Sequence, residues 1–408
     1  MKKVLIWDIS FRLANKGGPA GYLYNIHEYL HSHQCEQIVF LSDLYPKRKT
    51  NHAEQTSSVK QRLLEAIKTN RFIYRINDLL YIIWKQYHTC NVRLPEGMNL
   101  NEYDFVHFHQ VNDVRRYASL LKNTGCKTIL TTHCPCPMTD EQLAGHPWYY
   151  RLFAPWLRWQ ERQCYKNADY LLFPCKEARE PYEKDIQIRK LFHALEHKFV
   201  YCPSAIQDVI IDENKMQRFS DFGIPKDAFV ITYFGRHNAI KGYDILKQIG
   251  ERLLPKYPNL YFLCAGKGEI EPLRHPRWIE LGFISNTAEL LQQSDLYILP
   301  NRETYFDLIV LEVLRSATPI ILAENGGNKS FLHLSQEERT GMSFCRTGAV
   351  EEYCLQAERH IKMQTDNRFH YASLGQKNRT LWEKQYSMSR YVSGYQSIID
   401  SLCYKREY

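Results

Sequence analysis

Short apolar runs separated by longer amphipathic stretches repeat along most of the chain. Several runs are apolar at every position, which is typical of parallel strands that helices cover on both faces. The intervening stretches, for example 21–31, 244–254 and 308–315, show helical periodicity. The pattern predicts an α/β protein with parallel sheets. The predicted strands lie at 4–6, 38–41, 105–108, 128–131, 170–173, 199–201, 229–234, 260–265, 278–281, 296–299 and 319–323.

The strands and helices form two consecutive series, each long enough for a doubly wound, Rossmann-like sheet. The second series begins after about residue 205, and the join is polar. We therefore expect an N-terminal domain of residues 1–205, a C-terminal domain of residues 206–385 and a terminal helix at 386–408. Such sheets bind ligands at the carboxyl ends of their strands, so the expected site is a central cleft between the two domains.

Composition and charge narrow the class of protein. The 408 residues are 44% hydrophobic and 24% charged, with a formal net charge of +8. This composition supplies an ample core, and the basic excess favours an anionic ligand or an anionic membrane surface. The basic residues form no dense stripe, so a nucleic-acid partner is not expected.

Cysteines and apolar runs indicate the compartment. The 12 cysteines are scattered and form no Cys-x-x-Cys pair, so we expect reduced thiols in the cytoplasm and no metal site. The opening run at 4–6 is too short for a signal peptide and predicts a first strand. No run of 18 or more apolar residues occurs, so no membrane span is expected.

Residues 60–87 differ from the rest of the N-terminal half. Basic residues alternate there with aromatic and aliphatic ones. This pattern fits two interpretations. One is a helix that covers the N-terminal sheet, and the other is an amphipathic helix that contacts an anionic membrane from the cytoplasmic side.

A glycine loop at 16–21 follows the first predicted strand. Gly17 and Gly18 let the backbone approach a ligand closely, and the next helix presents its N-terminal amides to anionic groups. A generic glycine turn is the alternative. The loop lacks Gly-x-Gly-x-x-Gly and a following ribose-binding acid, which argues against an NAD-dependent oxidoreductase.

Two further loops follow strands of the second series. Arg236 and Lys241 lie in the loop after 229–234, where two cations can neutralise a diphosphate and its developing charge as a leaving group. The loop after 296–299 leads into a helix near Phe306, whose N-terminus is another anion site. Glu312 interrupts an apolar helix and needs a polar partner, for which a ribose diol is suitable.

These segments, in this order, resemble the retaining GT-B glycosyltransferases of glycosyltransferase family 4, also called glycosyl transferases group 1. The resemblance covers most of the chain. It includes the glycine loop, the helix and strand at 161–173, the linker at 223–227, and the segments 234–236, 265–268, 281–285, 294–300, 318–321 and 326–327.

The resemblance implies roles for matching residues. The N-terminal domain would bind the acceptor, the C-terminal domain would bind the nucleotide sugar, and the terminal helix would pack back on the N-terminal domain. The donor would contact Gly17, Gly18, Arg236, Lys241, Glu312 and the amides of Phe306, Asp307 and Leu308. His133 would lie in the active site near the donor sugar, and His109 would line the acceptor side. The family generally needs no metal, and the nucleoside diphosphate sugar is a substrate rather than a cofactor.

Three positions depart from the family pattern. The family usually has two glutamates separated by seven residues, but Thr304 stands where the first belongs if Glu312 is the second. Glu303 lies one place early. Asp307 replaces the usual glycine, where it can cap the helix but brings negative charge near a phosphate.

The expected function is transfer of a sugar to a saccharide or lipid-linked saccharide in cell-surface polysaccharide biosynthesis, including lipopolysaccharide biosynthesis. The aromatic and basic insert at 60–87 favours a lipid-linked acceptor, and a soluble acceptor is the alternative. A degenerate nucleotide-sugar-binding scaffold remains an alternative because of Thr304. An NAD-dependent oxidoreductase is a second alternative.

Overall fold

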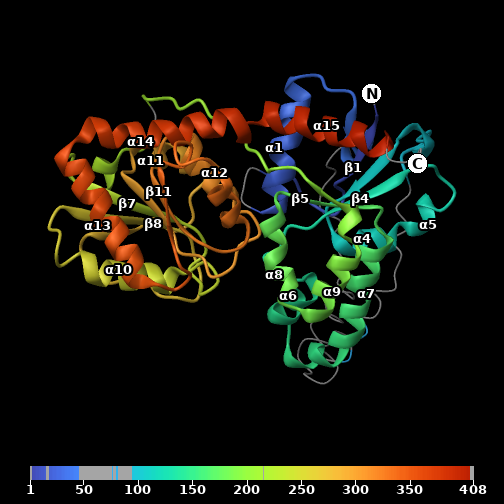
Figure 1. The fold of residues 1–408 in the computed structure, drawn as a ribbon, viewed down its shortest axis with the longest axis horizontal. Coiled ribbons are helices and arrows are strands. Elements are labelled where there is room, and N and C mark those ends of the chain that lie inside the picture. Colours follow the sequence, from blue (N-terminus) through green and yellow to red (C-terminus); the bar gives the residue numbers. More distant parts are fainter. Residues whose placement is uncertain are drawn as a thin grey trace, which may run out of the picture. The chain divides into compact units, whose positions relative to one another are not determined.

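The computed structural model describes residues 2–14, 18–45, 94–214 and 216–404, with the isolated positions 76 and 80. Two six-stranded sheets confirm the α/β prediction (Figure 1). By compactness the chain divides into one unit of Met1–Ser10, Glu36–Thr132 and Met138–Leu171 and a second unit of Phe11–Cys35, His133–Pro137 and Leu172–Tyr408. The domain boundaries expected from the sequence stay a prediction.

The first sheet has the strand order β2-β1-β3-β4-β5-β6. Strand β1 pairs in parallel with β2 on one side and β3 on the other, and β3 pairs in parallel with β4. The order therefore reverses beside β1. The strands are β1 (Val4–Trp7), β2 (Ile38–Phe40), β3 (Phe105–Phe108), β4 (Lys127–Thr131), β5 (Tyr170–Phe173) and β6 (Phe199–Tyr201). The helices in this part are α1 (Pro19–Ser32), α4 (Val111–Arg116), α5 (Ala118–Leu121), α6 (Met138–Gly145), α7 (Ala154–Asn167), α8 (Glu180–Glu183) and α9 (Ile186–Ala194).

The second sheet has the strand order β12-β11-β10-β7-β8-β9, and its strand pairs are parallel. The chain leaves β7 toward β8 and β9 and later returns to β10 on the other side. The order therefore reverses between β7 and β10. The strands are β7 (Phe229–Phe234), β8 (Leu260–Ala265), β9 (Trp278–Glu280), β10 (Leu296–Leu299), β11 (Ile320–Ala323) and β12 (Met342–Cys345).

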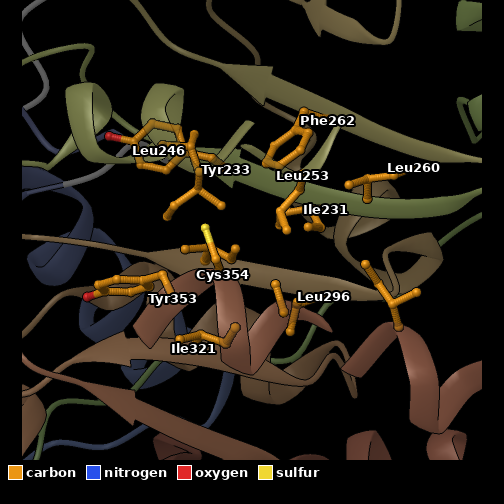
Figure 2. Packing of buried hydrophobic residues seen from close by; sticks show 14 of the residues in the cluster. Ile231, Tyr233, Leu246, Leu253, Leu260, Phe262, Leu296, Ile321, Tyr353 and Cys354 are labelled. Carbon is orange, nitrogen blue, oxygen red and sulfur yellow. The ribbon is translucent and has the colours of Figure 1, made fainter. Parts of the chain in front are cut away.

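Helices α10 (Tyr243–Leu253) and α13 (Val350–Asp366) contribute to one apolar core against the second sheet. Alternate residues of β7, such as Ile231 and Tyr233, join this core with Leu246 of α10 and Tyr353 of α13 (Figure 2). All four side chains are almost fully buried. The remaining helices are α11 (Thr287–Gln293), α12 (Leu308–Arg315), α14 (Arg368–Leu381) and α15 (Met388–Tyr404).

The C-terminal helix α15 contacts α1, which belongs to the same compact unit. The hydroxyl groups of Tyr22 in α1 and Tyr391 in α15 are 2.7 Å apart and share a hydrogen bond in a buried environment. A residue near the beginning of the chain is thus held by a residue near its end.

Among the described residues, no helix has the length and apolar character needed to cross a bilayer. The ten cysteines with described side chains form no disulfide. Gly17 and the segment 60–87, apart from Ile76 and Leu80, lie outside the described residues.

The core packing predicts a large effect for Leu246→Ala. The substitution removes a fully buried side chain from the cluster between α10 and the sheet. We expect it to lower the free energy of unfolding by about 2–5 kcal/mol in urea denaturation. Gln248→Ala on the exposed side of the same helix is the control, and we expect it to change stability by about 0.5 kcal/mol or less. Similar effects of the two substitutions would contradict this core assignment.

Candidate functional site

The predicted cations and the predicted helix N-terminus lie at the carboxyl edge of the second sheet. The loop 235–242 follows β7 and the loop 300–307 follows β10, the two strands between which the order reverses. In an open α/β sheet the connections diverge at this point and leave a crevice that binds ligands. Strand order therefore brings together two loops that are more than 50 residues apart in the sequence.

Close packing holds the first loop in place. Gly242 has φ of 68°, and a Cβ atom there would lie 2.0 Å from the carbonyl oxygen of Pro300, so this approach requires glycine. The Tyr233 hydroxyl lies 2.9 Å from the carbonyl oxygen of Arg236 and 3.3 Å from that of Lys241, and it donates to them. The Arg236 side chain is exposed and forms no ion pair with the described residues.

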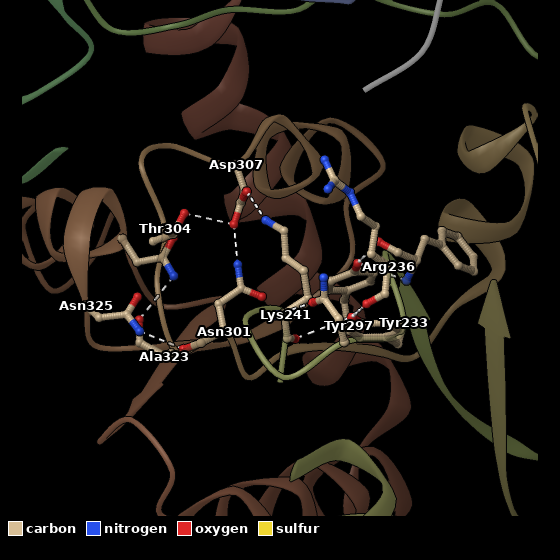
Figure 3. A network of polar contacts seen from close by, with 12 residues as sticks. Tyr233, Arg236, Lys241, Tyr297, Asn301, Thr304, Asp307, Ala323 and Asn325 are labelled. Carbon is tan, nitrogen blue, oxygen red and sulfur yellow. Dashed lines mark hydrogen bonds and ion pairs between the residues drawn. The ribbon is translucent and has the colours of Figure 1, made fainter. Parts of the chain in front are cut away.

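The second loop turns a carboxylate toward the first. Asp307 lies 2.5 Å from Lys241 Nζ and accepts a hydrogen bond of 2.8 Å from Thr304 Oγ1 (Figure 3). The Asn301 side-chain amide also donates to Asp307. Asn301 and Thr304 are fully buried, so packing fixes two of the three donors.

Arg302 connects the two loops, a role that the sequence did not predict. Its backbone amide donates to the carbonyl oxygen of Ile240 at 2.9 Å. Its guanidinium donates to Ala239 and forms a two-pronged ion pair with Asp244. Arg302 and Asp244 are 58 residues apart, and only the strand order makes them neighbours, so local sequence carried no signal for the pair.

Helix α12 places Phe306, Asp307, Leu308 and Glu312 along one element. Asp307 is the N-cap residue by position, but its side chain makes no capping bond, so it does not cap the helix as its residue type allows. Leu308 is the first helical residue, and the Phe306 ring lies 5.8 Å from that of Phe331. The amino end of α12 therefore keeps the partial positive charge of an uncapped helix.

The Glu312 carboxylate accepts a hydrogen bond of 2.6 Å from the Thr287 hydroxyl at the start of α11. Burial raises the pKa of Glu312, which the hydrogen bond from Thr287 partly offsets. Thr287 is thus a polar partner of the kind that the sequence led us to expect for this carboxylate.

Thr304 and Glu303, at the departures from the family pattern, have different environments. Thr304 is fully buried and bonded to Asp307. Glu303 pairs with Lys184 at 2.8 Å, and its side chain is 34% exposed. Glu303 therefore has a different partner and a different exposure from Thr304, which stands where the family has its first glutamate.

His133 lies in the loop after β4 and contacts α1. Its ring centroid is 5.0 Å from that of Tyr22, the residue that bonds Tyr391. Burial among surrounding atoms lowers the pKa of His133 to about 3, although the side chain keeps part of its accessible surface. The imidazole is therefore neutral near pH 7. Gly18, the N-cap residue of α1, has φ of 78°.

His109 follows β3 and is buried, with 3% of its surface exposed. Its ring centroid lies 4.1 Å from that of His107, whose Nε2 is 2.8 Å from Thr131 Oγ1. His109 belongs to the first compact unit and His133 to the second. The role of His109 toward an acceptor stays a prediction.

A pocket also lies at the opposite, amino end of β10 and β11. It contains none of the predicted site residues, so we assign the candidate site to the carboxyl edge on chemical grounds. The pocket lining includes Asp295, Arg315, Ala317, Pro319, Arg368 and Arg379.

Comparison with known proteins finds similarity to glycosyltransferases in both halves of the chain. Residues 16–191 match the family model described as Glycosyltransferase Family 4, and residues 228–362 match the model described as Glycosyl transferases group 1. The Anabaena protein HepE, solved in complex with UDP-glucose, superposes with a TM-score of 0.57 at 12% identity over 99% of this chain and 100% of that chain. The fold is that of a GT-B glycosyltransferase. The prediction of the GT-B fold is confirmed, and both matching family models are described as glycosyltransferases.

Sequence relatives of this GT-B chain are glycosyltransferases of several kinds. A glycogen synthase from Clostridium kluyveri is 28% identical over 32% of this chain and 29% of its own length. An O-antigen biosynthesis glycosyltransferase from Escherichia coli is 23% identical over 50% of this chain and 58% of its own length. The chain thus spans less than two thirds of the length of either relative.

The environment of His133 predicts how the stability of the GT-B chain depends on pH. The ordinary pKa of this histidine is 6.5 and the folded value is about 3, so only the unfolded chain is protonated between them. The neutral His133 ring in the folded chain therefore contributes fully to the free energy of unfolding above pH 6.5, and this contribution is lost as the pH falls toward the folded pKa. From pH 6.5 to about 4.5, we expect the wild type to lose about 2 kcal/mol of unfolding free energy relative to His133→Gln. Urea denaturation at both pH values measures this difference. His370→Gln, at an exposed histidine, is the control, and parallel curves for wild type and His133→Gln would contradict the assignment.

Proposed function

We propose that the protein is a retaining glycosyltransferase that moves a sugar from a nucleoside diphosphate sugar to a saccharide or lipid-linked saccharide. The observation that carries the proposal is the gathering of Arg236, Lys241 and the uncapped amino end of α12 at the strand-order reversal of the second sheet. Two cationic side chains, one of them paired with Asp307, and a helix amino end are groups that bind the diphosphate of a donor.

The proposed reaction exchanges one acetal bond for another. The bond between the anomeric carbon and the diphosphate oxygen breaks, and the acceptor hydroxyl oxygen bonds to the same face of that carbon. The acceptor proton passes to a departing diphosphate oxygen. Negative charge grows on the diphosphate, so cations fixed beforehand at its position lower the barrier.

The remaining donor contacts follow from the resemblance. Glu312, held by Thr287, would bind the ribose diol, and Gly17 and Gly18 would approach the transferred sugar. His133 would act near the donor sugar as a neutral hydrogen-bonding group, because its lowered pKa disfavours the imidazolium. His109 would lie on the acceptor side. No metal is needed in this proposal.

Two comparisons support the choice of substrates. HepE was solved with UDP-glucose, and one sequence relative is named for O-antigen biosynthesis. We therefore propose a nucleotide-sugar donor and a role in cell-surface polysaccharide biosynthesis.

The donor-site proposal predicts the effect of removing either cation. Lys241→Ala and Arg236→Ala each remove charge stabilisation from the leaving diphosphate, so we expect transfer to fall at least about 100-fold while the fold is retained. The nucleotide is first identified by thermal shift of the wild type with UDP, GDP, ADP, CMP, their sugar conjugates and NADH. The two variants should lose the shift with the nucleotide that stabilises the wild type.

Lys226→Ala, at an exposed lysine outside the two loops, is the matched control and should behave as wild type. Full transfer by both site variants would remove the donor-site assignment. A folded wild type that responds to no nucleotide would favour a degenerate scaffold, and a response to NADH alone would favour an oxidoreductase.

We also propose peripheral contact with the cytoplasmic face of an anionic membrane through residues 60–87. The basis is the composition of the segment, since each basic residue near an anionic surface contributes about 1 kcal/mol. The protein should sediment with vesicles containing anionic lipid, and added salt should weaken this association. Replacement of the basic residues by glutamine should abolish it, and unchanged sedimentation would contradict the proposal. The replaced residues are Lys60, Arg62, Lys68, Arg71, Arg75 and Lys85.

A further inference from the structure

A carboxylate lies among the groups that the proposed site offers to an anion. Asp307 lies at the amino end of α12 but does not cap it. The carboxylate instead accepts from Lys241 Nζ at 2.5 Å, from Thr304 Oγ1 at 2.8 Å and from the Asn301 amide. A phosphate at this position would seek the same kinds of donor.

The position of this carboxylate is built into the fold. Asn301 and Thr304 have no exposed surface, so neither can turn toward solvent without local rearrangement. The side chain of Asp307 is 17% exposed and that of Lys241 is 24% exposed. Partial burial makes their attraction stronger than that of a surface ion pair.

The two cations of the crevice are therefore not equivalent before a ligand binds. Lys241 is neutralised by Asp307, whereas Arg236 is exposed and forms no ion pair among the residues that the structure describes. A diphosphate that approaches Lys241 has to displace the carboxylate or bind beside it. In either case, Lys241 contributes less to the binding free energy of the diphosphate.

We propose that Asp307 competes with phosphate for Lys241 and thereby weakens binding of the nucleoside diphosphate product more than binding of the nucleotide-sugar donor. The inference rests on the proposed function of this site. A free nucleoside diphosphate carries about one more negative charge near pH 7 than its sugar ester, because its terminal phosphate has a second ionisation near pH 6. Repulsion from a fixed carboxylate grows with that charge. Asp307 thus favours release of the product over loss of the donor.

Two base-free probes test this effect directly. Inorganic pyrophosphate carries about one more negative charge near pH 7 than P1,P2-dimethyl diphosphate, which imitates the diphosphate of a nucleotide sugar. Asp307→Asn keeps the size of the side chain and removes its charge. By isothermal titration we expect this variant to bind pyrophosphate at least about tenfold more tightly than wild type, and to bind the dimethyl ester with a smaller gain.

Two further variants make the result specific. Asp366→Asn replaces an exposed carboxylate at the end of α13 and should bind both probes as wild type does. When Lys241 is already replaced by Met, Asp307→Asn should change the affinity for pyrophosphate by a different factor than it does in the wild type, because the two side chains are coupled. Equal gains in both backgrounds would overturn competition for Lys241. Thermal unfolding of each variant checks that it is folded.

Other outcomes also decide the inference. Equal or weaker binding of pyrophosphate by Asp307→Asn overturns it. It is also overturned if added Mg²⁺ makes the wild type bind as tightly as the variant while the variant gains nothing, since Asp307 is then a cation ligand. Absence of binding to both proteins overturns the inference together with the diphosphate site. Tighter binding by the variant without transfer from any sugar nucleotide supports competition between Asp307 and phosphate for Lys241 but removes the transferase function.

Discussion

The reversal of strand order between β7 and β10 is the constraint on which the candidate site depends. A parallel sheet that grows in both directions from a central strand sends its connections away from one another, and ligands of such sheets generally bind at the loops where this occurs. Arg236, Lys241, Asp307 and the amino end of α12 all occupy these two loops or the element that follows them. Gly242 permits the close approach of the first loop to the end of β10.

Charge in this crevice is balanced rather than simply positive. Lys241 faces Asp307, Arg302 faces Asp244, and Arg236 remains exposed. The Arg302 pair ties the second loop to the start of α10 and has a structural role, whereas the Lys241 pair lies where the diphosphate is proposed to bind. Loops that are rigid before the ligand arrives lower the cost of positioning it. The Asp307 carboxylate lowers the affinity of the proposed site for an anion.

Burial determines the environments of the two histidines His133 and His109. His133 packs against Tyr22, and the resulting desolvation keeps its ring neutral. His109 is almost without exposed surface and lies against His107. In the sequence, these residues were singled out by the family resemblance and by their positions after predicted strands, and neither signal says anything about burial or protonation. For Arg236 and Lys241 the sequence carried a stronger signal of a ligand site than for the histidines, because one short segment combines their charges with the end of a strand.

The sequence by itself determined the α/β class, the approximate strands and helices, and the two loops that carry Arg236, Lys241 and Asp307, because apolar periodicity and strand-end motifs are local. The family resemblance added the GT-B fold, which structural comparison supports. Only the tertiary structure decided that Asp307 binds Lys241 instead of capping α12, that Thr304 is buried against it, and that Arg302 joins the loops. These contacts join residues that strand order makes neighbours, or they choose among several donors within reach, and neither outcome follows from local sequence.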